Sequence, residues 1–327
     1  MRSRSARDRA ARPAEAPVEP PGEPAVVLVT GATGGIGSAV VRAYTGRGAR
    51  LVLLARSTAA LDRLALETAG TPGAAAEPPL VVVADVADSG AMEKAVAAAV
   101  ERFGRLDVVV HSAAVVAYGR LTEVPTTVWD RVMEVGVNGT ANVARAALRV
   151  FERQAAEDGG KGARGKGVRG KGVRGGHLVV VGSILGRVTT PYMGSYVTSK
   201  FAVRGLVRVL QQESRSTPGV HVALVEPGSV DTPIYVLAGT YAGHVGRPPP
   251  PVARAAAVAR AVLAVVDGDR PFASVGLANP LMRLGFSAAP RLYDRLVGPL
   301  MRVAGLSRRR TDPTPGNVFD ASEDVTQ

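Results

Sequence analysis

The chain has 327 residues, 46% of them hydrophobic, with a formal net charge of +12 and no cysteine. This apolar fraction suits a globular protein with a sizeable core. The lack of cysteine excludes disulfides and thiolate metal sites. The four histidines are scattered without metal-ligand spacing, so we expect no metal. These features indicate a soluble intracellular protein, which we place in the cytoplasm.

Two segments outside the regular pattern are predicted to be unstructured. Residues 1–24 are rich in Pro, Arg and Ala and lack the apolar stretch of a secretory signal, so we expect a disordered leader. Residues 161–175 read KGARG-KGVRG-KGVRG and hold six Lys or Arg and no acid. They form either a solvated basic loop insertion or an anion-binding patch. No aromatic residues interleave them to stack bases, which argues against a nucleic-acid partner.

Short runs rich in Val and Leu alternate along the chain with Ala-rich stretches of helical spacing. Such runs suit strands buried on both faces, as in a parallel sheet. We predict strands at 25–30, 50–55, 80–85, 106–111, 177–182, 220–227 and 270–276. Helices are predicted at 36–47, 58–69, 88–103, 126–155, 195–217 and 251–268. The alternation predicts an α/β protein with a doubly wound parallel sheet, a Rossmann fold, in a single domain over 25–276.

A C-terminal helical extension is predicted over 277–307. Leu, Met and Phe recur there at helical intervals, interrupted by Pro290 and Pro299, so we expect two short amphipathic helices. Their apolar faces either pack on the domain or another subunit, or cover a membrane surface or the substrate. No segment is apolar and long enough to span a membrane. The polar stretch 308–327 is predicted to be a disordered tail.

The stretch TGATGGIG at 30–37 follows the first predicted strand and opens a helix, as a dinucleotide-binding turn does. Gly31 permits the tight turn, and Gly35 and Gly37 let backbone and helix approach a pyrophosphate. The helix N-terminus offers free N–H groups to the phosphates. The glycines fit both G-x-x-x-G-x-G and G-x-x-G-x-x-G, which leaves the subfamily open. We expect cofactor contacts at Gly31, Thr33, Gly35, Ile36 and Gly37.

The residues after the second strand indicate which dinucleotide binds. An acid there would hold the ribose 2′-OH of NAD, but no acid occurs from 38 to 61. Arg56 follows the strand instead, and a guanidinium suits a 2′-phosphate. We therefore predict NADP in preference to NAD. Asp85, at the end of the third strand, either reaches the adenine amino group or caps the next helix.

A catalytic set is predicted from Ser183, Tyr196 and Lys200. Tyr196 and Lys200 lie four residues apart on one helix face. A nearby ammonium is expected to lower the pKa of the phenol from its usual value of about 10. The phenol can then exchange a proton with an alcohol or carbonyl while hydride moves to or from a nicotinamide. Ser183 can hydrogen-bond the same substrate oxygen.

Together with HSAA at 111–114 and EPGSVDTP at 226–233, these motifs resemble the short-chain dehydrogenase/reductase family. The resemblance covers about residues 25 to 276 and fits the short-chain reductase branch, and the C-terminal part looks like a bacterial subgroup of unassigned oxidoreductases. It implies NAD(P)-dependent interconversion of a carbonyl and an alcohol, with Tyr196 as general acid/base. Lys200 would also hold the nicotinamide ribose. Further cofactor contacts are implied at Val86, Ser112, Ala113, Pro227, Gly228, Val230 and Thr232. By analogy with the family, we expect a homo-oligomer.

The sequence departs from the family pattern in two places. The usual Asn-Asn-Ala-Gly is replaced by His111-Ser-Ala-Ala, and the usual catalytic asparagine falls on Gly136. Asn138, two residues on, lies about 200° around an ideal helix and could substitute only if the helix is kinked. A slower or altered proton relay is therefore expected.

Three hypotheses for function follow. The first is an NADP-dependent oxidoreductase acting on a small to medium, fairly apolar carbonyl or alcohol. The second is a nucleotide-binding regulatory or scaffold protein with weak or lost turnover, suggested by Gly136. The third is a nucleic-acid or anionic-surface binder using 161–175. The substrate class in the first hypothesis comes from an apolar lining predicted at Val115, Val116, Ile184, Leu185, Ile234 and Leu237.

Overall fold

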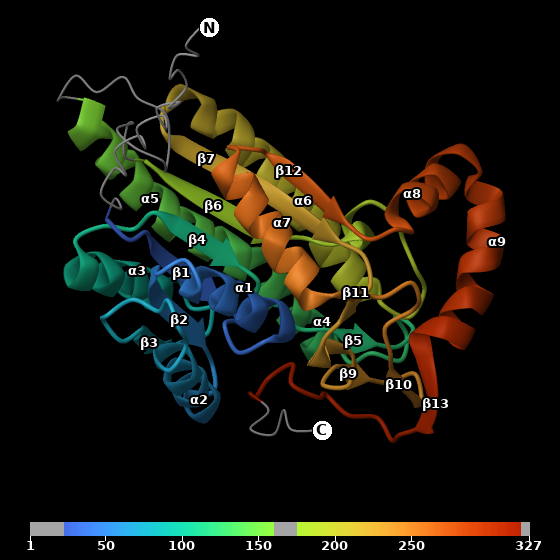
Figure 1. Ribbon diagram of the computed structural model, residues 1–327. Coiled ribbons are helices and arrows are strands. Elements are labelled where there is room, and N and C mark those ends of the chain that lie inside the picture. Colours follow the sequence, from blue (N-terminus) through green and yellow to red (C-terminus); the bar gives the residue numbers. More distant parts are fainter. Residues whose placement is uncertain (1–22, 160–174, 322–327) are drawn as a thin grey trace, which may run out of the picture.

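A computed structural model describes residues 23–159 and 175–321. The predicted leader (except for its last two residues) and nearly all of the basic loop lie outside the described residues, as do the last six residues. At the core is a seven-stranded sheet in which every strand pairs in parallel, in the order β12-β7-β6-β4-β1-β2-β3 (Figure 1). The strands are β1 (Val26–Thr30), β2 (Arg50–Ala55), β3 (Leu80–Val83), β4 (Val108–His111), β6 (Gly176–Val181), β7 (Val220–Pro227) and β12 (Phe272–Val275).

Helices cover both faces of the sheet, so the predicted doubly wound α/β fold is confirmed (Figure 1). One hydrophobic cluster lies between the sheet and α3, α5 and α6, and the other between the sheet and α1, α2 and α7. The helices are α1 (Gly35–Thr45), α2 (Thr58–Ala69), α3 (Ser89–Phe103), α4 (Thr126–Met133), α5 (Gly139–Gly159), α6 (Gly194–Glu213) and α7 (Ala255–Asp267). Strands buried on both faces explain the nearly continuous apolar runs.

The helix predicted over 126–155 is divided by a π-helical turn, η1 (Glu134–Asn138). This turn includes the position where the family pattern has an asparagine. Three short 3-10 turns lie in the connections of the described chain: η2 (Ile184–Gly186), η3 (Ser214–Ser216) and η4 (Pro233–Tyr235). A further π-helical turn is η5 (Met301–Gly305). No helix in the described part of the chain is both long and apolar enough to cross a membrane.

Three small strand pairs stand beyond the carboxyl ends of the main sheet (Figure 1). They are β5 (Ala117–Tyr118) with β9 (Gly239–Thr240), β8 (Val230–Asp231) with β11 (Ala253–Arg254), and β10 (His244–Gly246) with β13 (Leu306–Arg310). Between β12 and β13 run α8 (Asn279–Ala288) and α9 (Pro290–Leu300), which stand at one side of the molecule. The β10–β13 pair returns the chain from these helices to the domain.

The prediction of a disordered tail from residue 308 is wrong for the described residues up to 321. Residues 308–310 belong to β13, Thr314 exchanges backbone hydrogen bonds with Thr240, and Val318 is completely buried. The polar composition of this segment gave no sign of these contacts, because backbone pairing and one buried valine hold it. The segment ends beside β2, where it meets Arg56.

Candidate active site

A cavity of about 740 Å³ opens at the carboxyl ends of the strands, where β1 pairs with β2 on one side and β4 on the other. Ligands of doubly wound folds bind at this point, because the loops leave β1 and β4 in opposite directions. Every residue predicted for catalysis or cofactor binding lines this one cavity, including Gly31, Ser183 and Thr232. The six residues of the predicted apolar lining line it too. The structure shows that these residues lie around one cavity. Their roles in catalysis and cofactor binding remain predictions.

The glycine turn leaves space where side chains would block a ligand or the backbone. Gly31 has φ +63°, which favours glycine. A Cβ on Gly37 would lie 2.1 Å from the carbonyl oxygen of Gly31, and one on Gly35 would lie 2.5 Å from Cγ2 of Thr232. No side chain caps the N-terminus of α1, which begins at Gly35 and lines the cavity. These residues therefore fit a pyrophosphate at the helix N-terminus.

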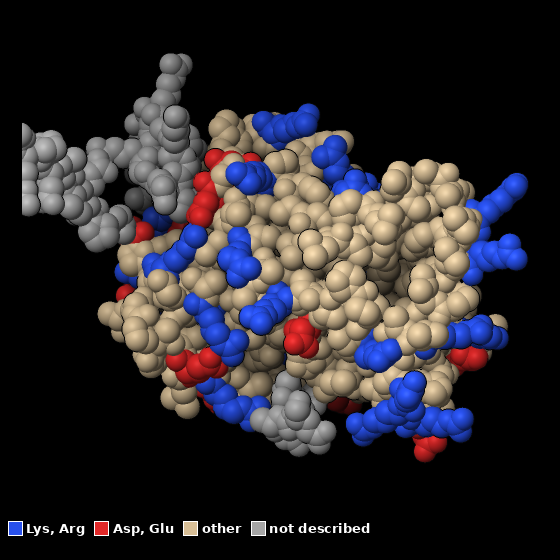
Figure 2. Space-filling model, turned by 45° about the vertical axis from the view of Figure 1, so that its right-hand side comes forward, with Lys and Arg blue, Asp and Glu red and all other residues tan. Residues whose placement is uncertain are grey.

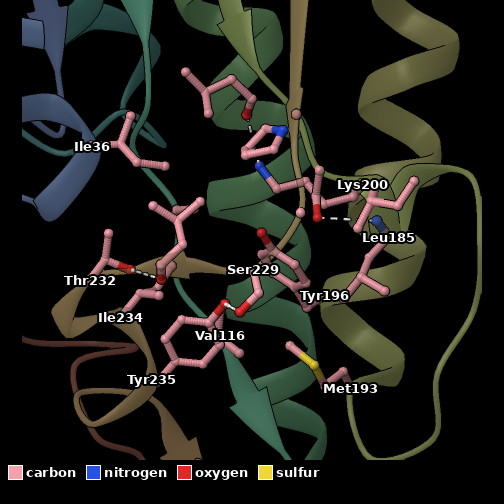
Figure 3. Close-up of a pocket in the computed structure, with 18 of the residues that line it drawn as sticks. Ile36, Val116, Leu185, Met193, Tyr196, Lys200, Ser229, Thr232, Ile234 and Tyr235 are labelled. Carbon is pink, nitrogen blue, oxygen red and sulfur yellow. Dashed lines mark hydrogen bonds between the residues drawn. The ribbon is translucent and has the colours of Figure 1, made fainter. Parts of the chain in front are cut away.

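Tyr196 and Lys200 project from α6 into the cavity, opposite Ile234 and Tyr235 (Figure 3). The Nζ of Lys200 donates to the carbonyl oxygen of Val181 at 3.1 Å and lies 5.5 Å from the centroid of the Tyr196 ring. Burial lowers the pKa of Lys200 to about 8. Ser183 is the N-terminal cap of η2, and its hydroxyl accepts from the N–H of Leu185. The predicted catalytic set is thus assembled at one place.

The prediction that Lys200 lowers the pKa of Tyr196 has the wrong direction in this structure. Burial raises the pKa of Tyr196, Tyr235 raises it further, and the Ser183 hydroxyl opposes them. The ammonium of Lys200 is turned toward the strand carbonyl of Val181, as its hydrogen bond shows. Tyr196 is therefore a protonated phenol at neutral pH in this structure.

The space for the family's asparagine is filled by another side chain. Gly136 is buried in η1, and a Cβ there would lie 2.9 Å from the Cβ of Ser199 and 3.0 Å from its hydroxyl. The Ser199 hydroxyl donates to the carbonyl oxygen of Tyr196 at 2.8 Å. Asn138 is exposed and is not among the residues of the cavity wall. Substitution by Asn138 required an irregular helix, and the π-helical turn makes the helix irregular here. The Asn138 side chain nevertheless does not line the cavity.

His111, at the start of the altered HSAA motif, joins three elements. Its Nδ1 lies 2.8 Å from the hydroxyl of Thr30 on β1, and its Nε2 lies 3.0 Å from the hydroxyl of Thr140 on α5. Thr140 donates its own proton to the carbonyl oxygen of Gly136, so Nε2–H of His111 is the donor to Thr140. His111, which stands where the family has an asparagine, therefore links Thr30 at the start of the glycine turn to the π-helical turn through Thr140.

Acid should destabilise the protein through His111. Burial lowers the pKa of His111 to about 3, and the charge of Lys200 contributes to the shift. The unfolded state, with a histidine pKa near 6.5, therefore binds more protons below that pH, and the free energy of unfolding falls with pH. Between about pH 7.5 and about pH 5 the loss should be about 2 kcal/mol. Denaturant unfolding of the parent and of His111→Asn across this range measures it.

The His111→Asn variant keeps donor and acceptor groups but cannot titrate. Its unfolding free energy should lack this component of the pH dependence, whatever its absolute stability. Equal pH slopes for parent and variant would contradict the assignment of a neutral, buried His111.

Arg56 follows β2 and lines the cavity, as predicted, but its donors are already engaged. Its guanidinium donates to the carbonyl oxygens of Asn317 at 2.7 Å and Phe319 at 2.9 Å, with longer contacts to those of Val318 and Asp320. Asn317 and Ala321 also line the cavity. The C-terminal segment thus forms part of the wall beside the predicted 2′-phosphate position.

Asp85 also lines the cavity, and the alternative that it caps the next helix is wrong. The cap of α3 is Asp88, whose carboxylate accepts from the N–H of Ala91. Asp85 instead accepts from the N–H of Ala87 and forms an ion pair with Arg131 on α4. A contact of Asp85 with adenine stays a prediction.

Sequence reasoning missed several residues of the wall. Tyr118, Met193 and Tyr235 line the cavity, and the hydroxyl of Tyr235 lies 3.5 Å from that of Ser229 (Figure 3). These residues lie in or beside short irregular segments between the main strands and helices, where no local pattern marks them. Several apolar residues of α8 and α9 line the cavity as well, among them Leu281 and Leu296, as the alternative that these helices cover the substrate requires.

The histidines are not all scattered in space. His177 and His221 pair across β6 and β7, and their rings stack with centroids 4.6 Å apart. The Nε2 of His177 lies 2.8 Å from Oδ1 of Asp269, and the possible ligand atoms of the three residues lie within 4.8 Å of one another. Sequence spacing could not reveal a cluster that strand register creates. The rings are only 10° from parallel, so their lone pairs do not converge on one ion in this arrangement.

The fold and the cavity define a dinucleotide-dependent oxidoreductase, and comparison with known proteins identifies its family. The family described as short chain dehydrogenase matches residues 25–163 and 167–238, more than half of the chain. The chain therefore belongs to the short-chain dehydrogenase/reductase family and is an NAD(P)-dependent enzyme of that family.

Similar proteins and structures agree with this assignment. Dehydrogenase/reductase SDR family member 7B of Bos taurus is 29% identical over 85% of this chain and 82% of its own length. An uncharacterized oxidoreductase of Staphylococcus epidermidis is 29% identical over 64% of this chain and 79% of its own. An alcohol dehydrogenase from the archaeon Thermococcus sibiricus, complexed with 5-hydroxy-NADP, is 27% identical with a TM-score of 0.62, covering 77% of this chain and 96% of that one. A short chain dehydrogenase from Burkholderia cenocepacia in complex with NADP, at 24% identity and a TM-score of 0.64, covers 85% of this chain and 99% of that one and supports the fold.

Proposed function

We propose that this enzyme interconverts a carbonyl and an alcohol by hydride transfer with NADP, with Tyr196 as the general acid/base. The observation that carries the proposal is that Ser183, Tyr196 and Lys200 share one cavity with the glycine turn. A dinucleotide on the turn and a substrate at the phenol would therefore lie in the same space. The bound nicotinamide supplies or accepts the hydride.

The protonation states of the side chains are those that reduction requires at neutral pH. The phenol of Tyr196 holds the proton that the oxygen of a reduced carbonyl must receive, although the burial that raises its pKa also makes it a weaker acid. Ser183 can hydrogen-bond and orient the same oxygen. Lys200 is buried beside the phenol with a pKa of about 8, so it can carry and return a proton near neutral pH.

Two observations support NADP. Arg56 lines the cavity after β2, and no acid occurs from 38 to 61 to hold a ribose 2′-OH. The Thermococcus sibiricus enzyme is complexed with 5-hydroxy-NADP. A 2′-phosphate at Arg56 would share the guanidinium with the carbonyls of residues 317–320, and charged hydrogen bonds of this kind are stronger than neutral ones.

Other expectations stay part of the proposal. A homo-oligomer rests on the family analogy, and a cytoplasmic location rests on the lack of cysteine. The alternative of a nucleotide-binding protein with weak or lost turnover rests on Gly136, and the same experiment distinguishes it. The hypothesis of a nucleic-acid binder depends on residues 161–175, nearly all of which lie outside the described residues.

The proposal is tested by deuteride transfer and by cofactor titration. NADPH carrying deuterium at C4 should deliver it to the carbonyl carbon of a neutral ketone, giving a labelled alcohol by mass spectrometry. NADPH should bind at least about tenfold tighter than NADH, because charged hydrogen bonds contribute about 1.5–3 kcal/mol. This preference should collapse in Arg56→Ala, as measured by calorimetry.

Arg63→Ala, on the neighbouring helix α2 and outside the cavity wall, is the matched control and should keep the preference. If cofactor binds but no ketone of a broad panel is labelled, the enzyme proposal fails and the regulatory alternative gains. Equal affinities of the parent for NADPH and NADH would refute the role of Arg56.

A further inference from the structure

The wall of the cavity opposite the reaction centre is built from apolar residues that pack against little else. Leu281 on α8 and Leu292, Leu296 and Leu300 on α9 all line the cavity. Their exposed fractions are 73%, 57%, 49% and 61%, respectively. The three leucines of α9 recur every four residues and so form one stripe along the helix. This stripe faces the cavity.

The charged side chains of the described cavity wall lie at the predicted cofactor end and at the reaction centre. Among the described residues of its wall, the charged ones are Arg56, Asp85 and Lys200. The arginines of the extension, Arg283 on α8 and Arg295 on α9, are not part of the wall. Figure 2 shows a hollow in a tan surface, and the Lys and Arg of this view lie on the surface around it rather than inside it. A ligand along α8 and α9 would thus meet no charge that could balance a phosphate or carboxylate of its own.

Hydrogen bonds attach α9 and the segment after it to the rest of the domain. The hydroxyl of Tyr293 on α9 donates to the carbonyl oxygen of Thr189 at 2.8 Å. After α9, Arg302 donates to the hydroxyl of Tyr192 at 2.8 Å, and Arg247 donates to the carbonyl oxygen of Ala304 at 3.0 Å. These contacts attach α9 to the domain near its first turn and just after its last residue, so both ends of the helix are fixed.

The apolar wall is continuous with the reaction centre. Val116, Leu185 and Met193 line the cavity close to Tyr196 (Figure 3). The same cavity extends from them to α8 and α9. A molecule whose carbonyl lies at the Tyr196 hydroxyl can therefore lay an apolar chain along the leucine stripe without leaving the cavity.

We propose that the substrate is a neutral, lipid-like carbonyl or alcohol whose long apolar chain lies along α8 and α9. This inference rests on the proposed function, and it replaces the small to medium substrate expected from the sequence with one that carries a longer apolar chain. Burial of each methylene against the leucines stabilises the complex, while an anionic group on the chain would be desolvated without a partner.

The test uses binding rather than turnover. A series of 2-alkanones from six to ten carbons is titrated into the enzyme saturated with NADP⁺, which cannot reduce them. Affinity should rise about three- to fourfold per added methylene. A ketone of the same length ending in a carboxylate should bind at least about tenfold more weakly. Leu296→Asn should flatten the dependence on chain length.

Leu284→Asn is the matched control, because Leu284 lies on α8, is 63% exposed and is outside the cavity wall. It should keep the full dependence. No dependence on chain length, equal effects of the two variants, or tighter binding of the carboxylate would overturn the inference. So would sedimentation showing that a second copy covers the stripe and is released by Leu296→Asn.

The two proposals fail in different ways. Chain-length-dependent binding without deuteride transfer would refute the proposed function and leave the apolar site standing. Deuteride transfer to short ketones, with affinities independent of length, would refute the long-chain substrate alone.

Discussion

Replacing Tyr196 by Phe should lower the rate of hydride transfer about a thousandfold and leave NADPH affinity within about twofold, since general acid catalysis contributes 10²–10⁴-fold. The change removes one hydroxyl and keeps the partly buried ring that lines the cavity. The lost hydroxyl is the proposed proton donor. Among the described residues, no other hydroxyl lies in its place beside Ser183 and Lys200 to donate the proton instead. Single-turnover oxidation of NADPH by a ketone measures the rate, and calorimetry measures the affinity.

Tyr241→Phe is the matched control, since it deletes a hydroxyl from a tyrosine outside the cavity wall. It should turn over like the parent. If Tyr196→Phe retains a rate within tenfold of the parent, the acid is another group and the proposed role of Tyr196 is wrong.

Restoring the family's asparagine by Gly136→Asn should destabilise the protein by about 1–3 kcal/mol, the usual cost of overpacking, and should not raise turnover. The new Cβ would lie 2.9 Å from the Cβ of Ser199, which belongs to the same helix as Tyr196 and Lys200. The clash must therefore move η1 or the catalytic helix. Denaturant unfolding and the single-turnover rate measure both effects.

Two further variants separate this clash from a general effect of asparagine in a helix. Gly205→Asn on α6 meets open space and should be tolerated. In a Ser199→Gly background, Gly136→Asn should cost at least about 1 kcal/mol less, a coupling typical of residues in contact. A stable and faster Gly136→Asn enzyme would instead show that the missing asparagine limits the parent.

The parts of the fold that follow from local pattern could be predicted. All seven strands of the main sheet appear within a few residues of the apolar runs, because the strands inside the sheet are buried on both faces and the edge strands β3 and β12 are still partly covered. The glycine turn, Ser183 and Tyr196 could be placed together because the carboxyl ends of parallel strands meet at one edge. The positions of these residues after the predicted strands were therefore enough to predict that they meet at one cavity.

What could not be predicted depends on contacts between distant segments. Arg56 meets carbonyls more than 260 residues later, and nothing in the tail's polar sequence points to β2. Ser199 fills the space over Gly136 because of how α6 crosses η1, which no spacing rule gives. The direction of the pKa shift of Tyr196 depends on burial and on Tyr235, whereas the sequence showed only the nearby lysine.

The position of the C-terminal segment has a practical consequence for anyone who produces this protein. Asn317 and Ala321 line the cavity, and the guanidinium of Arg56 donates hydrogen bonds to backbone carbonyl oxygens of this segment, including that of Phe319. A tag or fluorescent fusion joined close after residue 321 would therefore begin beside the wall of the cavity. A purification handle at the other end of the chain is the safer choice for measuring cofactor affinity.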